Sequence, residues 1–301
     1  MDLTLLARSL RGRHDWRGGR ARRVLHAAKY LWRSLRRPRL HAGWLRFVHD
    51  TPLLTAMLAR DPRLLERAQH PYISRRLPVA RRYAILQSHY RLLLARLPTP
   101  ALEAVLLRGA LPLGALALKD GAPARLELRP PTGRGREGEL ALYLLDASGQ
   151  PLSSLIFTLA DDGRSLLVGC VQGAAAGLGR EAVRAFTRQS WGLRPKNLLL
   201  SMLYALAASL GAERVCGVGN AAHPFAGQPS KIKSDYDAFW RECHGMPGAD
   251  GFYELPPREA PRDESQVESK HRSAFRRREA LRLEACHLLL LALAPPLARA
   301  A

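Results

Sequence analysis

Two short apolar runs separated by helical sequence, between residues 165 and 218, restrict the fold more than any other feature of the chain. Leu166 to Val171, bounded by Asp162-Gly163 and Gln172-Gly173, predicts a buried strand, and Arg214 to Val218 predicts a second. A crossover of about 40 residues suits a right-handed connection between parallel strands. We therefore expect the two strands to be neighbours in one sheet, with ligands approaching their carboxyl ends.

The crossover between these strands contains two predicted helices. The first, residues 180–189, places Arg180, Arg184 and Arg188 on the side opposite its apolar residues. The second begins near Pro195, because proline is tolerated at the first helical position, and it ends at Gly211. It is apolar on most of its circumference, so we expect it to be buried.

Elements on either side extend this unit into a larger sheet. Strands are predicted over residues 126–128, 139–145 and 154–159, and a capped helix at Ser234-Asp235 precedes another strand over 252–255. These elements predict an α+β fold with a mixed sheet and flanking helices. The expected organisation is a basic helical N-terminal region (1–110), an α/β core (111–262), and a basic linker with a C-terminal helix (263–301).

The charge of the chain favours an anionic partner. Its formal net charge is +21, with 47 Lys and Arg against 26 Asp and Glu, which is typical of proteins that bind nucleic acid, an anionic membrane or an acidic ligand. Basic and apolar residues alternate within residues 1–50, and Arg276-Arg277-Arg278 precedes the last apolar helix. Each terminus is interpreted either as a solvated helix that docks on the domain or as a contact with an anionic surface.

The cysteines and the longest apolar runs bear on the compartment of the protein. The four cysteines lie far apart without a C-x-x-C pair, which favours neither a disulfide framework nor a zinc site, and we expect no metal. No signal-peptide hydrophobic region follows Met1, and the apolar run 288–294 is far shorter than the ~20 residues of a membrane span. A cytoplasmic protein is predicted, at most peripheral to the inner membrane.

The order of elements between residues 126 and 255 resembles that of GNAT-like acyltransferases, which implies a GNAT-like core and a coenzyme A thioester as cofactor. In that superfamily, N–H groups at the start of the main helix cradle the pyrophosphate of coenzyme A. The corresponding loop here is 192–197, so the resemblance implies a cofactor-binding set that consists of Gln172, Gly173, Arg194, Lys196 and Asn197. The spacing of glycines in 172–179 departs from the usual motif, and an ordinary surface role for Arg194 and Lys196 stays open.

The same resemblance implies a catalytic set. Acyl transfer from a thioester needs a base, an acid for the departing thiolate and donors for the oxyanion. Tyr236, on the helix after the second strand, is the expected acid, His223 the base, and Asn220 the residue that orients the substrate. We expect these three side chains to line one cleft between the strand ends. The alternative is that Tyr236 faces the core and His223 only shapes a loop.

A closer resemblance covers most of the chain. The segments LVGCVQG (167–173), GLRPKNLLL (192–200), NAAH (220–223), KIKSDYDAFW (231–240), DGFYELP (250–256) and ESKHRSAFRRR (268–278) are similar to the signature of the bacterial VirK/YbjX family. The resemblance implies an association with virulence, envelope adaptation and antimicrobial-peptide resistance, but no assigned reaction.

Two functions are therefore expected. The first is transfer of an acyl group from acyl-CoA or acyl carrier protein, with an envelope component as one acceptor. The alternative is a non-enzymatic basic protein that binds nucleic acid or an anionic membrane surface through its termini. The oligomeric state is unknown from these features.

Overall fold

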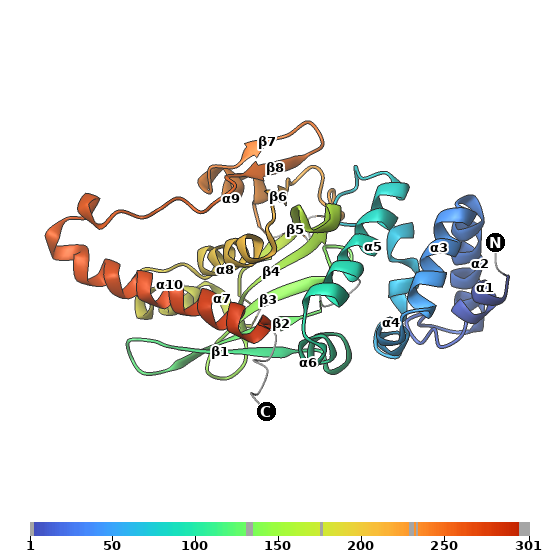
Figure 1. Cartoon of the computed structure of the whole chain (residues 1–301), viewed down its shortest axis with the longest axis horizontal. Helices are drawn as coiled ribbons and strands as arrows, with labels where there is room; N and C mark the ends of the chain where they lie inside the picture. Colours follow the sequence, from blue (N-terminus) through green and yellow to red (C-terminus); the bar gives the residue numbers. More distant parts are fainter. Residues whose placement is uncertain (1–2, 131–134, 175–176, 229–231, 233, 295–301) are drawn as a thin grey trace, which may run out of the picture.

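The structure is a computed structural model that describes residues 3–130, 135–174, 177–228, 232 and 234–294 (Figure 1). An eight-stranded mixed sheet lies at its centre, in the order β1-β2-β3-β4-β5-β6-β8-β7. The strands are β1 (Leu111–Ala117), β2 (Pro123–Arg129), β3 (Leu140–Leu145), β4 (Pro151–Ala160), β5 (Ser165–Gln172), β6 (Arg214–Val218), β7 (Met246–Pro247) and β8 (Phe252–Leu255). The α+β class is confirmed.

Helices precede, interrupt and follow the sheet, as expected. The N-terminal ones are α1 (Leu3–Ser9), α2 (Arg20–Arg36), α3 (Pro38–His49), α4 (Pro52–Met57), η1 (Pro62–Gln69), α5 (Val79–Arg96), α6 (Thr99–Glu103) and η2 (Ala104–Arg108). The later ones are η3 (Asp161–Gly163), α7 (Gly179–Gln189), α8 (Pro195–Leu210), α9 (Tyr236–Glu242), η4 (Glu264–Gln266), η5 (Ser269–His271) and α10 (Arg272–Leu293).

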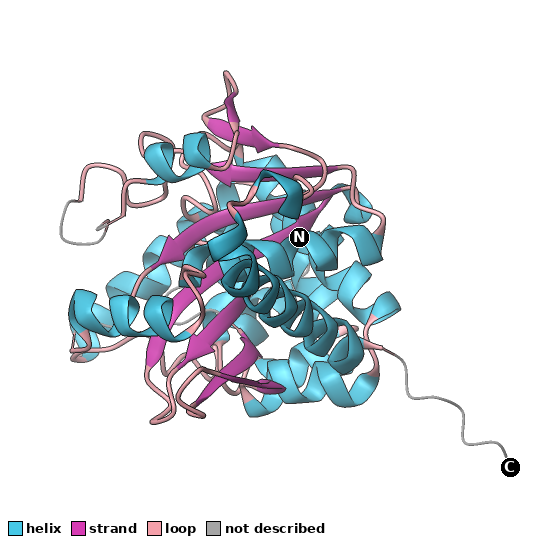
Figure 2. Cartoon of the chain, turned by 90° about the vertical axis from the view of Figure 1, so that its left-hand side faces the viewer, coloured by secondary structure: helices cyan, strands magenta, loops and turns pink. Residues whose placement is uncertain are grey.

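The helices around the sheet form two groups. Helix α8 packs against β3, β4 and β5, and α10 packs on α8 and β1. Helix α5 packs against β4 and connects the sheet to α1–α4, which gather at one end of the molecule (Figure 1). Figure 2 shows the twist of the sheet and the helices around it. None of the helices in the described part of the chain has the length and hydropathy that crossing a membrane requires.

The predicted parallel pair is present at the centre of the sheet. Strands β5 and β6 are parallel, in a register that runs from Ser165 opposite Arg214 to Val168 opposite Gly217. All other paired strands of the described sheet are antiparallel. Strand β6 ends at Val218, whereas β5 continues to Gln172. The two strands are therefore no longer paired at their carboxyl ends.

A β-bulge marks the point where β5 leaves β6. Phe157 of β4 pairs with Val168, and Ile156 pairs with Cys170, so Gly169 is the extra residue. A Cβ atom at Gly169 would collide with the backbone oxygen of Glu137, which passes close over the strand. Glycine is therefore required here, because only it permits this approach.

A buried ion pair connects the N-terminal helices to the sheet. Arg67 of η1 forms ion pairs with Asp61 and with Glu139, and the Tyr90 hydroxyl donates a 2.6 Å hydrogen bond to the Glu139 carboxylate. The side chains of Arg67 and Glu139 are only 1% and 0% exposed. Since removal of one partner would strand a buried charge, this contact fixes η1 against the start of β3.

Candidate functional site

A cavity of about 680 Å³ opens at the start of α8, beside the end of β5. Much of its wall is apolar and comes from α7, α8, α9 and the beginning of β4; the apolar side chains are Leu152, Val183, Pro195, Ala238 and Phe239. Four cationic side chains also line it, namely Arg184, Arg188, Arg194 and Lys196, and they outnumber its two acidic side chains, Asp235 and Glu242. A ligand with an apolar body and anionic groups would match this combination.

Four of the five predicted cofactor-binding residues border this cavity. Gly173, Arg194, Lys196 and Asn197 line it, because the crossover returns the chain to the carboxyl end of β5 before α8 begins. Gln172 does not line the cavity. It is exposed at the end of β5, and its backbone oxygen accepts a 2.7 Å hydrogen bond from Ser153.

The beginning of α8 is determined by local sequence. Arg194 has extended backbone angles at the N-cap, and Pro195 follows at the first helical position, as the sequence predicts. The N–H groups of the first turn of a helix have no partner within the helix, and the helix dipole adds partial positive charge there. The first turn of α8 borders the cavity, so this end of the wall favours a negatively charged ligand.

Lys196 differs from the arginines around the cavity. Arg194 pairs with Glu242, and Arg188 pairs with Glu181, whereas within the described ranges no ion pair joins Lys196 to a carboxylate. Its ammonium group lies 3.3 Å from the Ser234 hydroxyl and 5.5 Å from the ring centre of Phe239. Burial lowers the pKa of Lys196, and the nearby Cys170 opposes this change.

Cys170 and Tyr236 form a buried pair next to Lys196. The Tyr236 hydroxyl lies 3.2 Å from the Cys170 sulfur, and the two residues are 3% and 0% exposed. Burial raises the pKa of both groups. The neighbouring Cys170 raises the pKa of Tyr236 further, and the charge of Glu137 raises the pKa of Cys170 further. Both therefore stay protonated at neutral pH, and the sealed thiol is not an accessible nucleophile.

His223 packs against this pair from the loop after β6. Its ring stacks on Tyr236, with ring centres 5.1 Å apart and an interplanar angle of 14°. Its Nδ1 accepts from the backbone N–H of Phe225, so Nε2 carries the proton, 3.2 Å from the Glu137 carboxylate. That approach is outside hydrogen-bond geometry.

Asn220 has a different role from the one predicted. Its Nδ2 donates to Asp235, and its Oδ1 accepts from the backbone N–H of Tyr236, at 2.8 and 2.9 Å. The backbone N–H of Asn220 also donates to Asp237. These bonds hold the start of α9, so the side chain positions Tyr236 and is not available to orient a substrate.

The predicted catalytic residues lie together but do not line an open cleft. Asn220 and His223 each contact Tyr236, yet none of the three borders the cavity at the start of α8. The expectation of one open cleft between the strand ends is therefore wrong, because aromatic rings fill that space. Glu254, which also follows β6 in the sequence, pairs with Arg214 on the exposed surface.

Two residues of this cluster were not predicted from the sequence. Glu137 follows a glycine-rich loop, and Cys170 lies inside an apolar strand, so neither has a local motif. The available signal was Gly169, since a glycine within a strand often marks a bulge or a close backbone approach. Among the described residues, no group of three or more His, Cys, Asp or Glu side chains is arranged to hold a metal ion.

Comparisons with known proteins agree on one family. A family model described as "Protein of unknown function (DUF535)" matches residues 19–286. The chain is 30% identical over 257 residues to "Uncharacterized protein YbjX" of Escherichia coli, which covers 83% of this chain and 78% of that protein. It is 29% identical over 143 residues to an "Uncharacterized protein" of Haemophilus influenzae, or 46% and 48% of the two chains. No solved structure matches significantly.

Proposed function

The chain belongs to the bacterial VirK/YbjX family, described as DUF535, and we propose that it binds an acyl thioester of coenzyme A or acyl carrier protein and transfers the acyl group. The observation that carries this proposal is the cavity at the start of α8, with Lys196 and Arg194 on its wall. An envelope component is the acceptor that the family association suggests.

The composition of the cavity wall fits a thioester ligand. Its volume of about 680 Å³ lies within the range of roughly 300–1,000 Å³ that small-molecule sites occupy. The apolar side chains suit an acyl chain and the pantetheine arm, and the cations suit the phosphate groups. Lys196 is the best placed of these cations, because the arginines around it already pair with glutamates.

The strand order supports a GNAT-like core as part of the proposal. An antiparallel series β1–β5 leads into the parallel pair β5 and β6, and α9 and β8 follow. Helix α8 then has the place of the main helix that receives the pyrophosphate in GNAT-like enzymes. The insertion of α7 before α8 departs from that pattern, as does the glycine spacing in 172–179.

Tyr236 is the proposed donor of the proton that the departing thiolate takes up, and it reaches the thiolate only when the side chains of the wall between them move aside. It is the first residue of α9, and its buried phenol stays protonated at neutral pH. Its hydroxyl contacts Cys170, and the side chain is 3% exposed and does not line the cavity, so the phenol lies behind the cavity wall. His223 has no free ring nitrogen to accept a proton in this arrangement, because Nδ1 accepts from the Phe225 N–H and Nε2 faces Glu137, so no residue is assigned here as the base.

Calorimetry with acyl-CoA tests the proposal. We expect saturable binding of acetyl-CoA or a long-chain acyl-CoA that the combined change Arg194→Glu and Lys196→Glu abolishes. Arg180→Glu is the matched control, because Arg180 is exposed on α7 and does not line the cavity.

Helix α2 supports a second candidate, binding to an anionic membrane surface. Its exposed apolar side chains Val24, Leu25, Trp32 and Leu35 are 67%, 51%, 57% and 59% exposed, and at 100° per residue they form one stripe. The helix contains no acidic residue, and Arg22, Lys29 and Arg36 flank the stripe. Such a helix suits the plane of a membrane interface. Binding to nucleic acid would use the positive charges of α2 but would not require its apolar stripe.

A further inference from the structure

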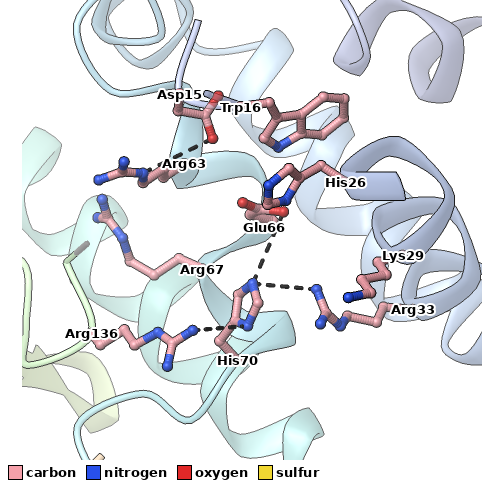
Figure 3. Close-up of a pocket in the computed structure, with 10 residues that line it drawn as sticks. All are labelled: Asp15, Trp16, His26, Lys29, Arg33, Arg63, Glu66, Arg67, His70 and Arg136. Atoms are coloured by element: carbon pink, nitrogen blue, oxygen red, sulfur yellow. Dashed lines mark hydrogen bonds and ion pairs between the residues drawn. The ribbon is translucent and has the colours of Figure 1, made fainter. Parts of the chain in front are cut away.

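A second cavity lies between α2, η1 and the segment that leads into β3. It has a volume of about 310 Å³ and its wall is dominated by charged side chains. Five of them are cationic, namely Lys29, Arg33, Arg63, Arg67 and Arg136, and two are acidic, Asp15 and Glu66 (Figure 3). Neither the proposed thioester site nor the apolar stripe of α2 accounts for this concentration of positive charge.

The two acidic residues are already engaged by an arginine outside the cavity wall. Arg13 donates to both oxygens of Asp15 at 2.9 Å and forms a 3.1 Å ion pair with Glu66. By contrast, no carboxylate in the described ranges forms an ion pair with Lys29 or Arg33. The cavity therefore keeps an excess of positive charge on its α2 side.

His70 lies between two guanidinium groups, those of Arg33 and Arg136 (Figure 3). Nη1 of Arg33 is 3.5 Å from Nε2 of His70, and Nη2 of Arg136 is 3.2 Å from Nδ1. A neutral imidazole accepts at only one nitrogen. The ring therefore accepts from at most one of the two guanidinium groups, and the other contact leaves positive charge facing the cavity.

Two buried N–H donors at the same cavity have no acceptor among the described residues. They are Nε1 of Trp16 and Nε of Arg67, and the two residues are only 6% and 3% exposed. Buried donors are nearly always paired in folded proteins. A bound oxyanion would supply acceptors to such donors and neutralise the excess charge at the same time.

We propose that this cavity binds a phosphate-class oxyanion, such as a phosphomonoester or diphosphate group. Arg33 and Lys29 would hold it from α2, and the Nε–H of Arg67 and the indole N–H of Trp16 would donate to it from the opposite wall. The volume of about 310 Å³ admits the anionic group together with part of the molecule that carries it. That group belongs either to a soluble metabolite or to a lipid headgroup.

Calorimetry at fixed ionic strength separates these sources, with inorganic pyrophosphate and the soluble short-chain lipid dihexanoyl phosphatidate as probes. The test variant is Lys29→Ala with Arg33→Ala, and the control is Arg39→Ala with Arg46→Ala, which removes the same charge from exposed positions on the neighbouring helix α3, outside the cavity. We expect one saturable site per chain, weakened at least tenfold in the test variant and less than twofold in the control.

Each outcome decides the proposal. Binding of pyrophosphate supports a phosphate site open to soluble ligands, and binding of the phosphatidate alone, with the same response to the variants, identifies a lipid headgroup. Absence of saturable binding of both probes, or an equal loss in the two variants, overturns it. Arg194→Glu with Lys196→Glu should leave this binding unchanged, so failure of the thioester proposal would be distinguishable.

Discussion

The hydroxyl of Tyr236 lies 3.2 Å from the sulfur of Cys170, in a buried position next to Lys196. This contact joins the start of α9 to the bulged end of β5, where the parallel strands separate. It also places a protonated phenol close to the cavity that we propose for a thioester. The chemistry of that phenol is the first point to test.

Tyr236→Phe should reduce acyl transfer while leaving the fold intact. Loss of a proton donor typically lowers turnover by about 10²–10⁴-fold, whereas loss of a buried hydroxyl that contacts a thiol should cost about 1 kcal/mol of unfolding free energy or less. Steady-state kinetics and urea unfolding measure the two effects. Tyr204→Phe on α8 is the control and should not alter turnover; equal losses in both variants would rule out a special role for Tyr236.

The buried pair of Arg67 and Glu139 should be important for stability. Burial raises the pKa of Glu139, and the charge of Arg67 opposes this change. Glu139→Gln should lower the unfolding free energy by about 3–5 kcal/mol, because a buried guanidinium loses a partner. Arg214→Gln, in the exposed pair with Glu254, should cost about 1 kcal/mol or less. Chemical denaturation measures the unfolding free energy of both variants. Similar losses in the two would contradict a special contribution of the buried pair to stability.

The stability of the N-terminal helices should fall in mild acid because of His41. Burial, followed by the charge of Arg13, lowers the pKa of His41 to about 4 from its ordinary 6.5. Its ring accepts from Tyr83 at Nδ1 and donates to Tyr30 at Nε2, which requires the neutral form. The unfolded chain therefore binds a proton between these two pH values that the folded chain does not, so stability is complete above pH 6.5 and is lost as the pH falls toward 4.

The size of this effect follows from the pKa difference. Between pH 7 and pH 5, His41 should contribute a loss of about 2 kcal/mol in unfolding free energy. His89, whose pKa burial lowers to about 3, adds to the loss in the wild-type protein. Urea unfolding at the two pH values for wild type and His41→Gln isolates the contribution of His41, and identical pH dependence in the two proteins would show that this ring titrates normally.

The apolar stripe of α2 should bind anionic vesicles. Leu25→Ser with Trp32→Ser should weaken binding to phosphatidylglycerol vesicles at least tenfold, because each apolar side chain contributes about 1.5–3 kcal/mol on burial. Leu283→Ser with Leu291→Ser removes two equally exposed leucines from α10 and should have little effect. Vesicle co-sedimentation measures both. Retention on DNA with no vesicle binding would favour nucleic acid instead.

The sequence predicted those parts of the fold that have local signals. Pro195 and Gly211 bound α8 as expected, and Arg214 to Val218 is β6 with unchanged limits, because proline, glycine and β-branched residues act locally. Strand β1 and the two-residue β7 were not predicted, since Gly114 and two prolines weaken their strand pattern. Their pairing partners, and not their own residues, hold them in the sheet.

The candidate site, like the fold, was predictable only where local sequence signals or the strand connection determine it. A βαβ connection requires that Gly173 and the 194–197 segment meet at one edge of the sheet, and they do. The contacts of Glu137 with His223 and of Arg67 with Glu139 join segments 86 and 72 residues apart, and no local pattern encodes such pairings. The side-chain bonds of Asn220 likewise depend on where α9 lies. The predicted domain limits and cofactor remain predictions.

The most direct test of the thioester proposal is isothermal titration calorimetry of the wild-type protein with acetyl-CoA and palmitoyl-CoA. We predict saturable binding of at least one of them, lost in Arg194→Glu with Lys196→Glu and retained in Arg180→Glu. If neither thioester binds, or if binding persists in the double variant, the cavity at the start of α8 is not a thioester site.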